Sequence, residues 1–283
     1  MPTALRRRRV ATAAALSALV ALTAAACAPA DSAVEALAAD NHIHRLVPST
    51  DGTALMLGTH NGLFTVDLAT GETAGPVGGN VVDLMGLTAA DGALLASGHP
   101  GASGEPPLQG PNLGFIRSDD GGETWEAMSL AGVADFHSLT YDGASDTFVG
   151  AAAGQILTSD DGGSTWRQGA AANPYDLLAT ESGLLMTSAD GLSRSSDGGS
   201  SFEPVDGAPP VALLGADGET VTGIEPDGQL WRSGPDGRWT RAGAAPEPMS
   251  AMAVLPGGDV VVATASGLLQ SGDLGGTWRS IIA

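Results

Sequence analysis

The sequence of 283 residues contains no lysine and a single cysteine. All twelve basic residues are arginines, and four of them stand at positions 6–9. After Cys27, the eight remaining arginines are set against 32 acidic residues, which leaves a net charge of −24. A surface of this charge repels nucleic acids and anionic lipid head groups, so we expect no nucleic-acid partner. A lone cysteine also excludes a disulfide within the chain.

Glycine and proline are abundant instead, with 41 and 17 residues. This composition is typical of a turn-dense all-β protein and argues against a helical one. The length fits one domain, because sheet architectures often exceed about 200 residues without dividing. After the N-terminal segment, no stretch of the sequence is long and apolar enough to span a bilayer.

The first 26 residues have the features of a bacterial signal peptide. A charged segment at 6–9 precedes an apolar segment at 10–22, and three alanines then precede Cys27. Small residues ending in cysteine resemble a lipobox, in which the cysteine is lipidated and becomes the first residue of the mature protein. We therefore expect a signal peptide over 1–26, a tether over 27–40 and an extracytoplasmic lipoprotein anchored to the membrane by its lipid. Secretion without a lipid is the alternative, and the general and twin-arginine export routes both stay open.

An eight-residue pattern, S-x-D-x-G-x-T-W, recurs along the rest of the chain. Complete or weakened copies begin at Ser118, Ser159, Ser195, Ser233 and Ser271. Their spacings of 41, 36, 38 and 38 residues fit one four-stranded propeller blade per repeat. The short apolar strand before each copy occurs once more at 62–65, where a plain turn replaces the pattern. The repeats therefore predict an all-β fold, a six-bladed β-propeller over 41–283.

The pattern resembles the Asp box of the bacterial neuraminidase (BNR) repeat propellers. That family includes sialidases, sortilin-type receptors and secreted bacterial glycosyl hydrolase-like proteins, and the segments 42–44, 58–64, 97–100 and 135–139 look like the last group. The resemblance implies Asp-box turns between the third and fourth strands of each blade, counted from the axis outward. An aspartate in such a turn accepts backbone N–H groups, and the tryptophan fills the space between neighbouring sheets, so we expect structural roles for both. The residues concerned are Asp120, Trp125, Asp161, Trp166, Asp197, Asp273 and Trp278.

The register of the repeat also places the other strands. The innermost strands are expected at 42–47, 81–88, 136–140, 176–180, 211–214 and 250–255. A Gly- and Pro-rich loop over 99–112 is expected between the second and third strands of blade 2, and loops of this length are often functional. No strand is left over to cross between the first and last blades, so we expect the ring to close by packing of their faces.

All five histidines are expected on the face opposite the Asp boxes. They are His42, His44, His60, His99 and His137, and they lie in blades 1 to 3. Several imidazoles together could bind a transition metal, which would be copper if Met85 joins them and zinc if aspartates do. The alternative is that these histidines cap the ends of strands by hydrogen bonds to loop backbones.

A glycoside hydrolase is the second function that the resemblance raises. Sialidases gather three arginines around the substrate, whereas only Arg45 is expected in an innermost strand, so sialidase activity is not expected. A two-carboxylate glycosidase would use Asp83 and Asp135 as its best candidates. A monomeric platform for a cell-envelope protein or glycan is the third alternative.

Overall fold

A computed structural model describes residues 42–101, 108–234, 236–246 and 248–282. The expected signal peptide, the lipidated Cys27 and the tether lie outside these residues. Within the described ranges, no helix has both the length and the apolar character that a membrane crossing requires. One 3-10 turn, η1 (Val77–Gly79), links the first two sheets.

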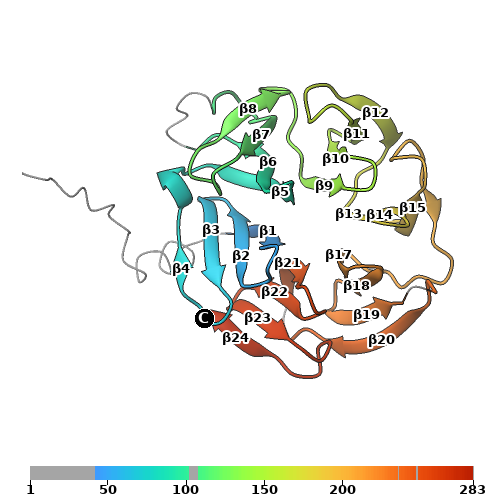
Figure 1. Ribbon diagram of the computed structural model, residues 1–283. Helices are drawn as coiled ribbons and strands as arrows, with labels where there is room; N and C mark the ends of the chain where they lie inside the picture. Colours follow the sequence, from blue (N-terminus) through green and yellow to red (C-terminus); the bar gives the residue numbers. More distant parts are fainter. Residues whose placement is uncertain (1–41, 102–107, 235, 247, 283) are drawn as a thin grey trace, which may run out of the picture.

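Six antiparallel sheets of four strands surround a central axis, as a six-bladed β-propeller does (Figure 1). Each sheet is one blade, and its strands follow one another in the sequence. The strands of blades 1 to 3 are β1 (Ile43–Pro48), β2 (Ala54–Thr59), β3 (Gly62–Asp67), β4 (Thr73–Ala74), β5 (Asp83–Ala90), β6 (Ala93–His99), β7 (Phe115–Ser118), β8 (Glu126–Ser129), β9 (Ser138–Asp142), β10 (Thr147–Ala152), β11 (Gln155–Ser159) and β12 (Arg167–Ala171). Those of blades 4 to 6 are β13 (Asp176–Thr180), β14 (Gly183–Ser188), β15 (Gly191–Ser195), β16 (Glu203–Pro204), β17 (Leu213–Asp217), β18 (Thr220–Ile224), β19 (Gln229–Ser233), β20 (Trp239–Ala244), β21 (Met249–Val254), β22 (Val260–Thr264), β23 (Gly267–Ser271) and β24 (Arg279–Ile282). The innermost strands are β1, β5, β9, β13, β17 and β21 (Figure 1).

The ring closes as the sequence predicts. No strand crosses between blades 1 and 6 in the described ranges, because β1–β4 and β21–β24 each form a complete sheet. One apolar cluster joins the two blades and includes Leu55 and Leu57 of blade 1 with Val261 and Ala263 of blade 6, all of them inaccessible to solvent. Burial of apolar surface between the faces therefore holds the first blade against the last.

Three innermost strands begin two residues later than the repeat predicts. They are β5, β9 and β17, which start at Asp83, Ser138 and Leu213. In blade 3 the reason is visible, because the backbone N–H of Phe136 donates to Ser97 Oγ in blade 2 at 2.9 Å and not to its own sheet. The residues directly before these innermost strands therefore lie outside the sheets, at the end of the ring that we call the rim.

The S-x-D-x-G turns lie between the third and fourth strands of their blades, as predicted. In blade 2, Ser118 Oγ donates to Asp120 Oδ1 at 2.8 Å, and Thr124 donates its backbone N–H to the same oxygen at 2.9 Å. Gly122 donates its N–H to Ser118 Oγ at 2.7 Å and has a φ of 98°, which favours glycine. The turns around Asp161, Asp197 and Asp273 repeat these contacts. Their carboxylates are thus occupied in shaping the turns.

The aromatic residue after each turn packs toward the preceding blade. The ring of Trp166 in blade 3 lies 5.1 Å from that of Phe115 in blade 2 and 4.8 Å from that of Phe136. Trp125 of blade 2 is only 6% exposed and shares an apolar cluster with Leu63 of blade 1. Trp278 of blade 6 packs against the cluster that contains Leu230 of blade 5. Large rings that fill the space between sheets stabilise the ring of blades.

The turns make acid stability a test of their role. The hydroxyl of Thr165, followed by its N–H, lowers the pKa of Asp161 to about 2, whereas the unfolded value is about 3.9. Because the folded pKa is lower, the carboxylate stabilises the fold above about pH 4, and this contribution is lost as the pH falls toward 2. We therefore expect Asp161→Asn to lower the Tm by more at pH 7 than at pH 2, as measured by circular dichroism. An equal decrease at both pH values would contradict this account.

Candidate metal centre

The five histidines lie in or directly beside strands of blades 1 to 3. His42 directly precedes β1, His44 lies in it, His60 occupies the turn after β2, His99 ends β6, and His137 directly precedes β9. His99 was expected to begin the long loop; the structure places it within the strand, opposite Asp83 in the ladder of β5 and β6. Four of the five side chains divide into two groups, each with an aspartate.

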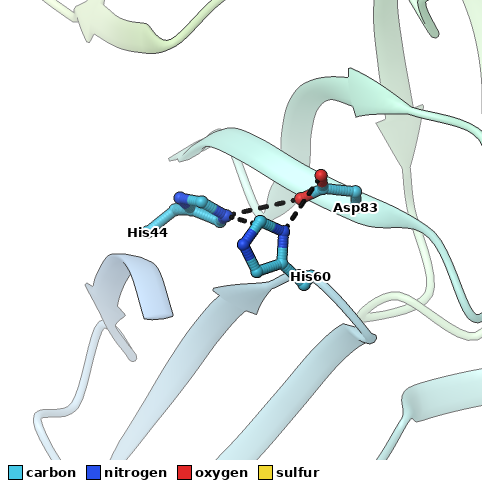
Figure 2. Close-up of side chains that lie close together, drawn as sticks. All are labelled: His44, His60 and Asp83. Carbon is cyan, nitrogen blue, oxygen red and sulfur yellow. Dashed lines mark hydrogen bonds and ion pairs between the residues drawn. The ribbon is translucent and has the colours of Figure 1, made fainter. Parts of the chain in front are cut away.

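The first group consists of His44, His60 and Asp83 (Figure 2). His60 Nδ1 lies 3.1 Å from Asp83 Oδ2, and His44 Nε2 lies 3.4 Å from Asp83 Oδ1. The same two ring nitrogens are 3.3 Å from each other. Ligand atoms around a tetrahedral ion at about 2.0–2.2 Å are separated by about 3.3–3.6 Å. The two imidazole nitrogens are therefore separated as neighbouring ligands of such an ion are, and each lies near the same distance from a different oxygen of Asp83.

Local irregularities of the strands bring these side chains together. The ladder between β1 and β2 pairs Ile43 with Thr59 and then Arg45 with Gly58, so His44 is the extra residue of a bulge. Such a bulge redirects a side chain and is common next to functional sites. His60 projects from the tight turn between β2 and β3, and its N–H donates to the carbonyl of His42 at 3.3 Å.

The protonation state of His44 suits a ligand. Burial lowers its pKa to about 4; Asp83 opposes this effect, and His60, His42 and His137 add to it. The ring is consequently neutral at physiological pH, and a neutral imidazole offers an unprotonated nitrogen to a metal. The ring of His42 lies 4.8 Å from that of His44, so His42 is a neighbour of the set formed by His44, His60 and Asp83.

Two buried carboxylate oxygens of the rim have no hydrogen-bond donor. Among the described residues, three buried side-chain N or O atoms lack such a partner, and two of them are Asp83 Oδ1 and Asp135 Oδ1. His44 is near Asp83 Oδ1, but without the geometry of a hydrogen bond. A buried polar atom without a partner loses its hydration, at a cost of about 1–3 kcal/mol and more when it is charged. Both oxygens therefore favour a bound cation.

The second group consists of His99, Asp135 and His137. His99 Nε2 lies 3.2 Å and His137 Nε2 lies 2.6 Å from the same atom, Asp135 Oδ2. This group is more open than the first, since the side chains of His99 and His137 are 40% and 63% exposed. The two aspartates that were candidate glycosidase carboxylates are thus both held by pairs of imidazoles.

The methionines of the innermost strands differ in their surroundings. Met85 is the extra residue of a bulge in β5, which corresponds to the position of His44 in β1. Met252 is buried in the apolar cluster of blades 5 and 6, and Met249 packs against it. Both therefore belong to the apolar core of blades 5 and 6.

Sequence reasoning did not find the ion pair that supports this rim. Arg45 Nη1 donates to Asp176 Oδ1 at 2.6 Å, and its Nη2 donates to the carbonyl of His137 at 3.1 Å and to Ser138 Oγ at 2.8 Å. Blades 1 and 4, which contribute Arg45 and Asp176, face each other across the ring (Figure 1). The signal in the sequence was that Arg45 is the one arginine expected in an innermost strand.

No protein-family profile matches the sequence, and no curated protein is significantly similar to it. Solved structures do resemble the fold. The extracellular domain of a proposed hybrid two component system from B. thetaiotaomicron is 17% identical with a TM-score of 0.56, over 87% of this chain and 34% of that one. This chain therefore spans about a third of the length of that extracellular domain. A GH74 enzyme from Niastella koreensis is 15% identical with a TM-score of 0.54, and the match covers 85% of this chain and 47% of the enzyme's chain. A chain of the nidogen/laminin complex is 13% identical with a TM-score of 0.61, and the match covers 79% of this chain and 90% of that one. At these identities the likeness shows the propeller fold alone.

Proposed function

We propose that this protein is an extracytoplasmic lipoprotein whose propeller binds a transition-metal ion through His44, His60 and Asp83. The observation that carries the proposal is the convergence of two imidazole nitrogens and one carboxylate, whose ligand atoms all lie within 4.8 Å of one another. The buried Oδ1 of Asp83, which has no hydrogen-bond donor, supports the same interpretation. Three protein ligands leave a position for water or a bound molecule, as in catalytic zinc sites.

Zinc is the metal that this ligand set favours. Imidazole and carboxylate ligands suit zinc, whereas a thioether such as that of Met85 would shift the preference toward copper. Stripped protein dialysed against Zn(II) or Cu(II) is therefore expected to hold at least one zinc ion per chain and to melt at a higher temperature with zinc. At a free zinc concentration of 100 times the Kd, the expected stabilisation is about 2.7 kcal/mol. Bound metal far below one ion per chain for both metals would refute the proposal.

The lipid anchor is a separate part of the proposal, and it depends on the small-residue run that ends at Cys27. The extracellular position of the similar domain from B. thetaiotaomicron supports an extracytoplasmic location. We expect the protein to be found in the membrane fraction and the Cys27→Ser variant in the soluble extracytoplasmic fraction. Equal distribution of the two proteins would argue against lipidation.

Glycoside hydrolysis is the second candidate function. Its support is the structural likeness to a GH74 enzyme together with two carboxylates, Asp83 and Asp135, on one face. In an extracytoplasmic location, a protein or glycan of the cell envelope would be the partner of this protein, whether it binds a metal or hydrolyses glycosides.

A further inference from the structure

A second pair of imidazoles with one carboxylate lies beside the first, and the proposed function does not use it. His99 and His137 both direct Nε2 at Asp135 Oδ2, at 3.2 and 2.6 Å. The side chain of Asp135 is only 16% exposed, and its Oδ1 is buried without a hydrogen-bond donor. The second group thus shares two features with the first. Two imidazoles contact one carboxylate, and one oxygen of that carboxylate is buried without a hydrogen-bond donor.

The ring of His99 is oriented in the manner of a metal ligand. Its Nδ1 lies 3.0 Å from the carbonyl oxygen of Pro111, and a carbonyl can only accept, so Nδ1 carries a proton. This leaves Nε2 as the atom that faces Asp135. Histidines that bind metals characteristically donate their other ring N–H to a carbonyl or carboxylate, which fixes the tautomer and the ring plane.

The carbonyl of His137 is also held from outside the group. It accepts a hydrogen bond from Arg45 Nη2 at 3.1 Å, and Arg45 is itself held by Asp176. The backbone at the start of β9 is therefore fixed, and the ring of His137, which is 63% exposed, is held by its contact with Asp135. An ion would replace the proton between His137 Nε2 and Asp135 Oδ2 and lengthen this 2.6 Å contact to about 3.3–3.6 Å.

The two groups are neighbours through the ladder of blade 2. Asp83 of the first group is paired with His99 of the second, across β5 and β6. Residues opposite each other in an antiparallel pair have Cβ atoms about 4.5–5.5 Å apart and project to the same side. Asp83 consequently lies between the imidazoles of blade 1 and those of blades 2 and 3.

We propose that His99, Asp135 and His137 bind a second divalent transition-metal ion, so that the rim forms a two-metal centre with Asp83 between the ions. This inference rests on the proposed function of the first group. Two neighbouring ions, each with two imidazoles and one carboxylate, would each keep a coordination position for another ligand. Such a centre suits an anionic or oxygen-rich ligand that bridges both ions.

Metal stoichiometry tests the second ion separately from the first. Metal-free protein is loaded with Zn(II) at pH 7.5, and bound zinc is measured by inductively coupled plasma mass spectrometry. We expect two ions per chain in the wild type, one in His99→Ala, one in His44→Ala and none in the double variant. His137→Gln, at an exposed ring, provides a second variant that should also hold one ion, and Asp206→Asn on an exposed turn of blade 4 should hold two. Circular dichroism melts check that each variant is folded.

The other outcomes separate the two proposals. One ion in the wild type that persists in His99→Ala and His137→Gln but not in His44→Ala would overturn the second ion and leave the first site intact. One ion that is lost in all three variants would mean a single site shared by both groups, which also overturns the second ion. One ion that is lost only in His99→Ala and His137→Gln would overturn the first site and retain the second. No bound zinc would refute both sites.

Discussion

Replacing Asp83 by asparagine is expected to lower the affinity of the first site for zinc by at least about 100-fold. The variant has the same size, and Asp83 Oδ1 has no hydrogen-bond donor to lose, so the fold should persist. The change removes the negative charge that lies beside both His44 and His60. Loss of a partner outside the ligand shell already weakens metal binding by about 10–100-fold, and loss of a ligand should exceed that range. Competition with a chromophoric chelator at pH 7.5 measures the change.

Asp206→Asn is the matched control for Asp83→Asn, because it removes the same charge from an exposed turn in blade 4. Its zinc affinity should equal that of the wild type. A decrease of less than about threefold in Asp83→Asn would contradict the proposed ligand set. Turnover of aryl glycosides by the wild type that disappears in Asp83→Asn, without a change in bound zinc, would instead favour the glycosidase alternative.

The fold could be predicted because its signals are local and repeated. Each S-x-D-x-G turn uses residues a few positions apart, so the sequence alone sets its position between two strands. The period of the repeat then gives the number of blades and the direction of every strand. Antiparallel alternation is enough to place all five histidines on one face, although it does not say which of them meet.

The grouping of the histidines could not be predicted, because it depends on single residues and on closure of the ring. The bulge at His44 changes the register by one residue, and no pattern in the sequence marks it. The late start of β9 moves Asp135 and His137 out of the sheet and onto the rim. The pairing of Asp83 with His99 depends on the register of β5 and β6, which the bulge at Met85 shifts by one residue.

The ion pair between Arg45 and Asp176 depends even more on closure, since its partners are 131 positions apart and come together only across the completed ring. Asp176 Oδ1 accepts from Arg45, and its Oδ2 accepts the backbone N–H of Leu214 in blade 5 at 3.0 Å. The carboxylate thereby joins three blades, and the two side chains are only 17% and 5% exposed.

Replacing Asp176 by alanine is therefore expected to lower the free energy of unfolding by about 3–5 kcal/mol, because the partly buried guanidinium of Arg45 and the buried amide of Leu214 would lose their partner. A loss of this size corresponds to about 2–4 °C of Tm per kcal/mol in a chain of this length. Asp160→Ala is the control, because its ion pair with Arg167 at 3.1 Å is exposed on both sides and should contribute less than about 1 kcal/mol. Chemical denaturation of both variants measures the difference. If Asp176→Ala loses no more stability than Asp160→Ala, water must hydrate Arg45 in the folded protein, and the ion pair would not hold the rim of blade 3 in place.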